Sequence, residues 1–182
     1  MIRMLALAAV LLCAPVTLAQ DAKDNPFKKA KVGDYLAYKM TTSVMGKDFD
    51  VTMKQTITAI TEKEATLKSQ ASTMGFDLPA QETKIDLTKP YDPAAAVNQG
   101  KKGKAKFEKI SEGKEKITVN GKSYDCNWIS GKLSGEAKGL NIASEVKIWF
   151  SPAVPMSGLV KMEMKSNIAN VKMELSESGS AK

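Results

Sequence analysis

The sequence predicts an all-β, mainly antiparallel protein: a single strongly curved sheet or half-barrel of about nine strands with one or two short helices. Three observations support this prediction. Apolar and polar residues alternate along most of the chain, turn residues separate the alternating runs, and few segments look helical. Because alternation gives each strand one apolar face, a sheet of this size has to curl around that face.

The N-terminal half begins with an arm, residues 20–31, in which Asn25 followed by Pro26 is typical of the start of a helical turn. Alternating runs over 35–44 and 49–59 then predict a β-hairpin that turns at Gly46. Weaker alternation continues through 65–71. A second hairpin is expected to return along 81–87, after Gly75 and Pro79.

The C-terminal half repeats this organisation. Asn120-Gly121 is a strong hairpin signal, and its two-residue turn places Val119 opposite Lys122 and Ile117 opposite Tyr124. Further strands are predicted over 140–150, 160–165 and 171–175, with a rigid turn at 151–155.

Residues 88–106 lack this alternation. Asp92-Pro93 followed by three alanines predicts one or two helical turns, and the glycine- and lysine-rich stretch after them predicts an exposed basic loop. The polar residues 177–182 are expected to form a disordered tail. The predicted β domain therefore spans 32–176 and contains the loop at 88–106.

The first nineteen residues, 1–19, are typical of a signal peptide. Arg3 precedes a short apolar run, and small residues favour cleavage after Ala19. We therefore expect a periplasmic or secreted protein. Lipidation at Cys13 is not expected because the bulky Leu12 precedes it, and no later segment has the roughly 20 apolar residues of a membrane helix.

The charge pattern argues against a nucleic-acid partner. The formal net charge is +7, yet Arg3 is the only arginine and the chain has no histidine. Base-specific recognition depends largely on the bidentate arginine fork, which evenly spread lysines do not provide. The lysines fit a solvated surface or, alternatively, contacts with an acidic partner.

Enzymatic chemistry is also not indicated. Without histidine the usual base for a nucleophile is missing, and Cys126 lies between apolar residues on one predicted strand, as a buried inert thiol would. No spacing typical of a zinc or calcium site occurs. We therefore expect no catalytic residue, no metal and no cofactor.

Methionine is the unusual feature of the composition, with ten in the chain. Methionines on inward strand faces fill gaps in a core, line a pocket for a flexible hydrophobic ligand or, as soft thioethers, bind Cu(I). Our leading hypothesis is a pocket on the concave face for a lipid or lipoprotein acyl chain. Its predicted ligand-binding residues are Tyr38, Met40, Met53, Tyr124, Trp128, Met162, Met164 and Met173.

Three stretches carry a family resemblance: Val32 to Lys39, Gly121 to Cys126 and Lys147 to Lys161. They resemble uncharacterised small exported bacterial β proteins, whose outline is similar to the half-barrel of periplasmic lipoprotein carriers. The resemblance implies a curved sheet around a hydrophobic cavity and the handling of lipids or lipoproteins. The alternative hypothesis is an envelope interaction or structural protein that contacts an acidic partner through its surface lysines.

Overall fold

The computed structural model describes residues 25–44, 46–91, 106–137, 140–167 and 169–180. These residues form one short 3-10 helix, η1 (Pro26–Lys29), and ten strands. The strands are β1 (Tyr35–Val44), β2 (Lys47–Ile60), β3 (Glu64–Thr73), β4 (Phe76–Asp77), β5 (Gln81–Asp86), β6 (Lys106–Val119), β7 (Lys122–Ala137), β8 (Leu140–Phe150), β9 (Leu159–Ser166) and β10 (Ala169–Gly179).

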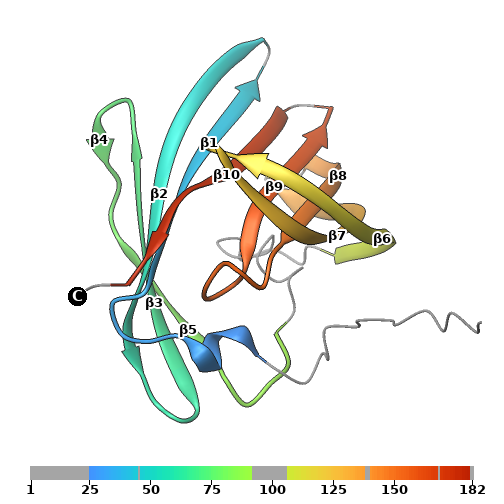
Figure 1. Cartoon of the computed structure of the whole chain (residues 1–182). Helices are drawn as coiled ribbons and strands as arrows, with labels where there is room; N and C mark the ends of the chain where they lie inside the picture. The colour runs from blue at the N-terminus through green and yellow to red at the C-terminus, as the bar shows by residue number, and fades with distance from the viewer. Residues whose placement is uncertain (1–24, 45, 92–105, 138–139, 168, 181–182) are drawn as a thin grey trace, which may run out of the picture.

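All ten strands belong to one antiparallel sheet with the order β4-β3-β2-β1-β10-β9-β8-β7-β6, and β5 pairs with β3 alongside β4. The sheet is open and strongly curved (Figure 1). This confirms the predicted fold class. The N- and C-terminal halves meet where β1 pairs with β10, so the first and last strands lie in the centre of the sheet.

The two clearest hairpin predictions are confirmed. Val44 pairs with Lys47 across the β1–β2 turn, and Val119 pairs with Lys122 across the β6–β7 turn. Strand β6 nevertheless begins at Lys106, well before the alternating residues that predicted it. Its first half is rich in lysine and glutamate, and it is held at the sheet edge by backbone pairing to β7 and by Phe107, which packs against the core.

The predicted helical turn at Asn25-Pro26 is present as η1. The Asn25 side chain accepts a hydrogen bond from the Phe27 amide, and its Nδ2 donates to the carbonyls of Asp86 and Lys89. The arm is thereby fastened to the end of β5. The predicted signal peptide (1–19), the helical turns at 92–96 and most of the basic loop lie outside the described residues.

The C-terminus stays in the sheet further than the sequence suggested. β10 pairs with β1 as far as Gly179, the Tyr35 hydroxyl donates to Glu177, and the Ser180 hydroxyl donates to Asp34. The segment expected to be disordered from position 177 is thus strand as far as Gly179. Its pairing partner is the start of β1, a contact that its polar sequence does not reveal.

The C-terminal half of the sheet curls until the β6–β7 turn reaches β10 (Figure 1). Asn120 Nδ2 donates to the Ser176 carbonyl over 2.8 Å, at the position where a β-bulge shifts the β1–β10 register. Strand β8 is covered on both sides, since Ile148 and its neighbour Trp149 are both buried. This strand departs from the expectation that each strand has one apolar face, because both of its faces are covered.

Candidate binding face

One face of the sheet carries a row of apolar side chains that crosses five strands. Residues directly opposite each other on antiparallel strands project from the same face, so the register defines the row. It contains Val51, Met40, Met173, Met162 and Ile148, on β2, β1, β10, β9 and β8 respectively. We call the surface around this row the methionine face, and it consists of Tyr38, Met40, Val51, Met53, Val146, Ile148, Met162, Met164, Val171 and Met173.

Part of this face is closed by other elements of the chain. Tyr38 is fully buried, in the same core cluster as Phe27 of η1 and as Val154 and Met156 of the loop between β8 and β9. The Tyr38 hydroxyl donates to the Leu159 carbonyl over 3.3 Å. Burial raises the pKa of this phenol, so it stays protonated and structural.

The remainder, which we call the open half, is only half-buried. It comprises Met40, Val51, Met53, Met162 and Met164, and its four methionines pack against the core without being covered as the central core residues are. These side chains come from three strands, β2, β1 and β9, and β10 lies between β1 and β9 in the sheet. The arrangement is a contiguous, soft apolar surface that offers no strong hydrogen-bond donor of its own.

The predicted ligand-binding residues divide between the two faces. Tyr38, Met40, Met53, Met162, Met164 and Met173 share the methionine face. Tyr124 and Trp128 do not join them, because Trp128 pairs with Trp149 while the neighbouring Ile129 pairs with Ile148. Alternation within one strand predicted which residues share a side, but only the pairing between strands decides which sides coincide.

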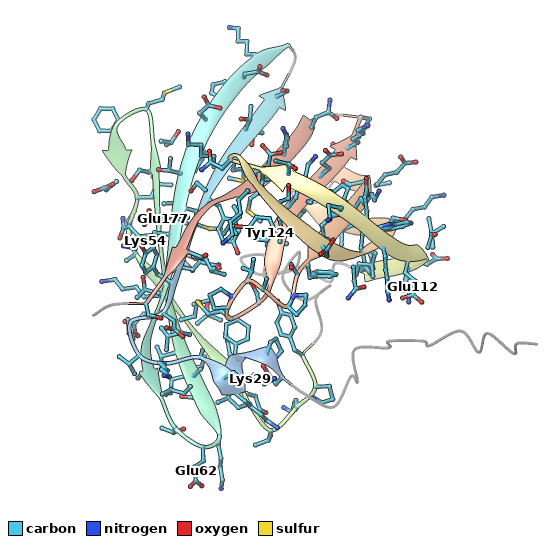
Figure 2. The ribbon with its side chains drawn as sticks, in the orientation of Figure 1. Lys29, Lys54, Glu62, Glu112, Tyr124 and Glu177 are labelled. Atoms are coloured by element: carbon cyan, nitrogen blue, oxygen red, sulfur yellow. The ribbon has the colours of Figure 1, made fainter. Side chains whose placement is uncertain are left out.

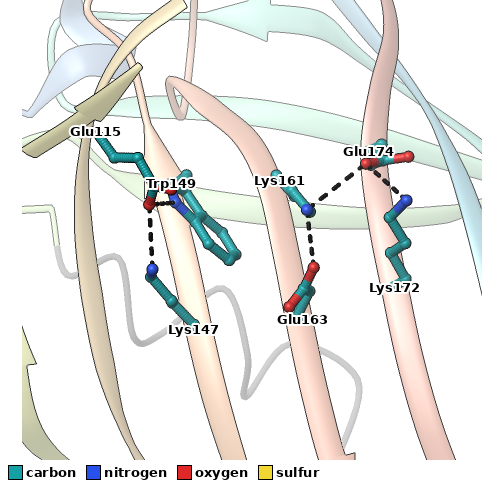
Figure 3. Close-up of polar contacts among 7 residues, drawn as sticks. All are labelled: Glu115, Lys147, Trp149, Lys161, Glu163, Lys172 and Glu174. Carbon is teal, nitrogen blue, oxygen red and sulfur yellow. Dashed lines mark hydrogen bonds and ion pairs between the residues drawn. The ribbon is translucent and has the colours of Figure 1, made fainter. Parts of the chain in front are cut away.

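The opposite surface, which we call the tryptophan face, holds two indoles and a set of charges: Glu115, Trp128, Lys147, Trp149, Lys161, Glu163, Lys172 and Glu174. Lys147 Nζ lies 4.3 Å from the centroid of the Trp128 ring and 4.6 Å from that of Trp149. Glu115 accepts from Trp149 Nε1 at 2.9 Å and from Lys147 at 3.1 Å (Figure 3). The contacts with Trp149 and with Lys147 hold the pKa of Glu115 below its ordinary value.

The charges on β9 and β10 are likewise paired. Lys161 Nζ lies 2.8 Å from Glu163 and 3.8 Å from Glu174, which also binds Lys172 at 2.9 Å (Figure 3). Lys161 also lies 5.1 Å from the centroid of the Trp149 ring. These groups satisfy one another, so the tryptophan face fits a structural role better than a catalytic one.

Cys126 projects from this same face, opposite Glu115. Burial, with the nearby Asp125 and Glu115 carboxylates, raises the pKa of the Cys126 thiol to about 11. The thiol is therefore protonated at neutral pH and is not an activated nucleophile. Among the residues that the structure describes, no three His, Cys, Asp or Glu side chains come together as metal ligands would.

The fold and this face together give the structural class of the protein: an open, curved antiparallel sheet with one half-covered apolar surface. In the described part of the chain, no helix has the length and apolar character needed to cross a membrane. The sequence matches no protein-family model and no curated protein.

Solved structures share the fold. A Bacteroides fragilis protein described as exported, with a YmcC-like fold, aligns with a TM-score of 0.57 at 11% identity, covering 82% of this chain and 96% of its own. A Parabacteroides distasonis protein described as a lipoprotein aligns with a TM-score of 0.57 at 13% identity and the same coverage, 82% and 96%. At these identities the likeness concerns the fold alone, and it agrees with the resemblance to small exported β proteins.

Proposed function

We propose that this chain is an exported, non-enzymatic protein that binds a lipid or another hydrophobic ligand, such as an acyl chain, on the open half of the methionine face. The observation that carries the proposal is a cross-strand row of methionines in which the half-buried Met40 and Met162 lie on either side of the buried Met173. Export is supported by the predicted signal peptide and by structural neighbours described as exported or as a lipoprotein.

The physical reason lies in the side chain of methionine. It is unbranched and polarizable, so a surface of methionines adapts to flexible apolar guests of varied length. A purely structural role predicts that such residues are buried as completely as Ile148, which is 0% exposed. The half-buried state of Met40, Met53, Met162 and Met164 instead leaves apolar surface for a ligand to cover.

A direct test starts with protein exported by its own leader and purified without detergent. Native mass spectrometry, followed by solvent extraction, is expected to find a co-purified lipid. The delipidated protein is then titrated with palmitate. A ligand-free preparation that also shows no saturable palmitate binding would refute the proposal.

The variant Met162→Gln/Met164→Gln provides the residue-level test. Placing two amides on the open half is expected to weaken palmitate binding by about tenfold or more, because polar groups are costly to cover with an acyl chain. Val32→Gln is the matched control, since Val32 is an exposed apolar residue outside the face. Equal palmitate affinity in the variant and the control would contradict the assignment of the site.

The proposal that the protein is not an enzyme rests on the lack of histidine and on the protonated state of Cys126. Capture of an acidic partner by lysines is the alternative hypothesis. On the tryptophan face Lys147, Lys161 and Lys172 already pair with glutamates, which reduces their availability. Salt-sensitive capture of a polyanion, without palmitate binding, would favour that alternative.

A further inference from the structure

The β3–β4 hairpin exposes large apolar side chains at its turn. Met74 is 73% exposed and Phe76 is 74% exposed, more than any other large apolar residue of the described chain. The hairpin projects from the edge of the sheet at the same end as the β1–β2 turn (Figures 1 and 2). Such exposure needs an explanation, because burial of these side chains is what a soluble domain ordinarily gains by folding.

The turn itself does not require a methionine. Met74 (φ 50°) and Gly75 (φ 80°) form a two-residue turn between the paired residues Thr73 and Phe76. Asn120 (φ 51°) and Gly121 (φ 76°) give the other well-defined turn of this kind. Asparagine tolerates this left-handed conformation well, whereas a long side chain disfavours it. The turn therefore does not require Met74, and folding alone does not explain why its side chain is exposed.

The hairpin continues the methionine face. Phe76 pairs with Thr73, Thr73 with Val51 and Val51 with Met40, so Phe76 lies at the end of the apolar row already described. Phe49, two residues before Val51 on β2, projects from the same face and is 37% exposed. The row thus leads from the open half to the exposed turn, with Thr73 between the apolar residues Val51 and Phe76.

Carboxylates at the end of the sheet that carries the β3–β4 and β1–β2 turns project from the side opposite the methionine face. Asp48 accepts from Ser43, Asp50 from Thr41 and Asp77 from Ser72. In each case the serine or threonine is the cross-strand partner of the aspartate. This end of the sheet is therefore amphipathic, with aromatic and methionine side chains and Lys47 on the methionine face and carboxylates on the opposite one.

We propose that the β3–β4 turn docks the protein onto a phospholipid bilayer by inserting Met74 and Phe76 into the interfacial zone, next to the open half that the proposed function assigns to an acyl chain. Large aromatic side chains bury roughly 150–250 Å² each, so this turn offers less than the roughly 800 Å² per partner of a stable protein interface. A small protruding apolar turn suits partition into the headgroup region. Because carboxylates flank the turn, docking does not depend on anionic lipid.

The test uses protein exported by its own leader, with its intact mass measured so that any lipidated or uncleaved form is removed. Binding to phosphatidylcholine vesicles is measured by co-sedimentation. The unmodified protein is expected to bind, with little effect of salt. The variant Met74→Asn/Phe76→Thr is expected to lower the partition coefficient about tenfold or more.

Asparagine at position 74 suits the turn, so this change should preserve folding and should not lower the melting temperature. Ile110→Thr is the matched control: Ile110 is 62% exposed on β6, at the other edge of the sheet, and its loss should leave vesicle binding unchanged.

Several outcomes would overturn the docking proposal. The first is that the unmodified protein does not bind vesicles, and the second is that the double variant binds them equally well. The third is binding that requires anionic lipid and disappears with salt, which would assign the binding to lysines. Capture of a protein by this turn in the absence of vesicle binding would do the same. Palmitate titration separates the two proposals, since the double variant should bind palmitate normally if only docking is lost.

Discussion

The methionine face and the tryptophan face belong to the same strands but are stabilised in different ways. On β8, Ile148 lies on the first face among aliphatic and thioether groups, while the adjacent Trp149 lies on the second, among Lys147, Lys161 and Glu115. The apolar face depends on packing and leaves part of its surface uncovered. The other face satisfies its charges internally. For this reason the proposed ligand is assigned to the methionine face, which leaves apolar surface uncovered.

The largest expected effect tests the closed part of the methionine face. Ile148→Ala should lower the free energy of unfolding by about 3 kcal/mol, because a fully buried side chain is lost and a cavity remains. Chemical denaturation measures it. Ile110→Ala, at an exposed position, should change the value by less than about 0.5 kcal/mol. Similar losses in both variants would contradict the burial described for β8.

A smaller effect is expected on the tryptophan face. Trp149→Phe removes the Nε1–H bond to Glu115 and some packing, and should cost about 1–2 kcal/mol in the free energy of unfolding. Trp128→Phe should cost less, since Trp128 is only half-buried. Palmitate binding is expected to be unchanged in both variants. Weaker palmitate binding in either would place the ligand on this face instead.

The smallest effect concerns pH. Glu115 has its pKa lowered from the ordinary 4.5 in the folded state, so it contributes stability above that value and loses the contribution as the pH falls through the lowered pKa. Glu115→Gln should therefore flatten the decline in unfolding free energy between neutral pH and about pH 3. Asp86, with its pKa lowered to about 2, remains in both proteins and supplies a common background. Parallel pH profiles would show that the ion pair is inert.

Within the described residues, the turns at Asn120-Gly121 and Met74-Gly75 each begin with a left-handed residue, and they show how far the sequence could be used for prediction. Asn120-Gly121 is a frequent turn pair, so the β6–β7 hairpin and its register were predicted correctly. Met74-Gly75 forms a turn with nearly the same φ angles, yet methionine is uncommon there, and the short strand β4 was missed. A turn near Gly75 was expected, but Met74 gave no signal for it, and Met74 and Phe76 are the most exposed large apolar residues of the described chain.

The candidate site was predicted in part for a similar reason. Methionines at alternate positions of β9 were correctly placed on one side, because a strand has a period of two. Tyr124 and Trp128 were grouped with them, but they project from the other face. The sequence of β7 or of β9 alone does not indicate which of its two sides lies on the same face of the sheet as a given side of the neighbouring strand.

The sequence by itself determined the class of fold, the turn at Asn120-Gly121 and which side chains of an alternating strand share a side, because these depend on local alternation and local backbone preference. The tertiary structure alone decided the strand order, the burial of Trp149 on the tryptophan face of β8 and the extension of the apolar row to Phe76. Those features arise from pairing between strands distant in the chain, and a shift of one residue in that pairing exchanges the two faces.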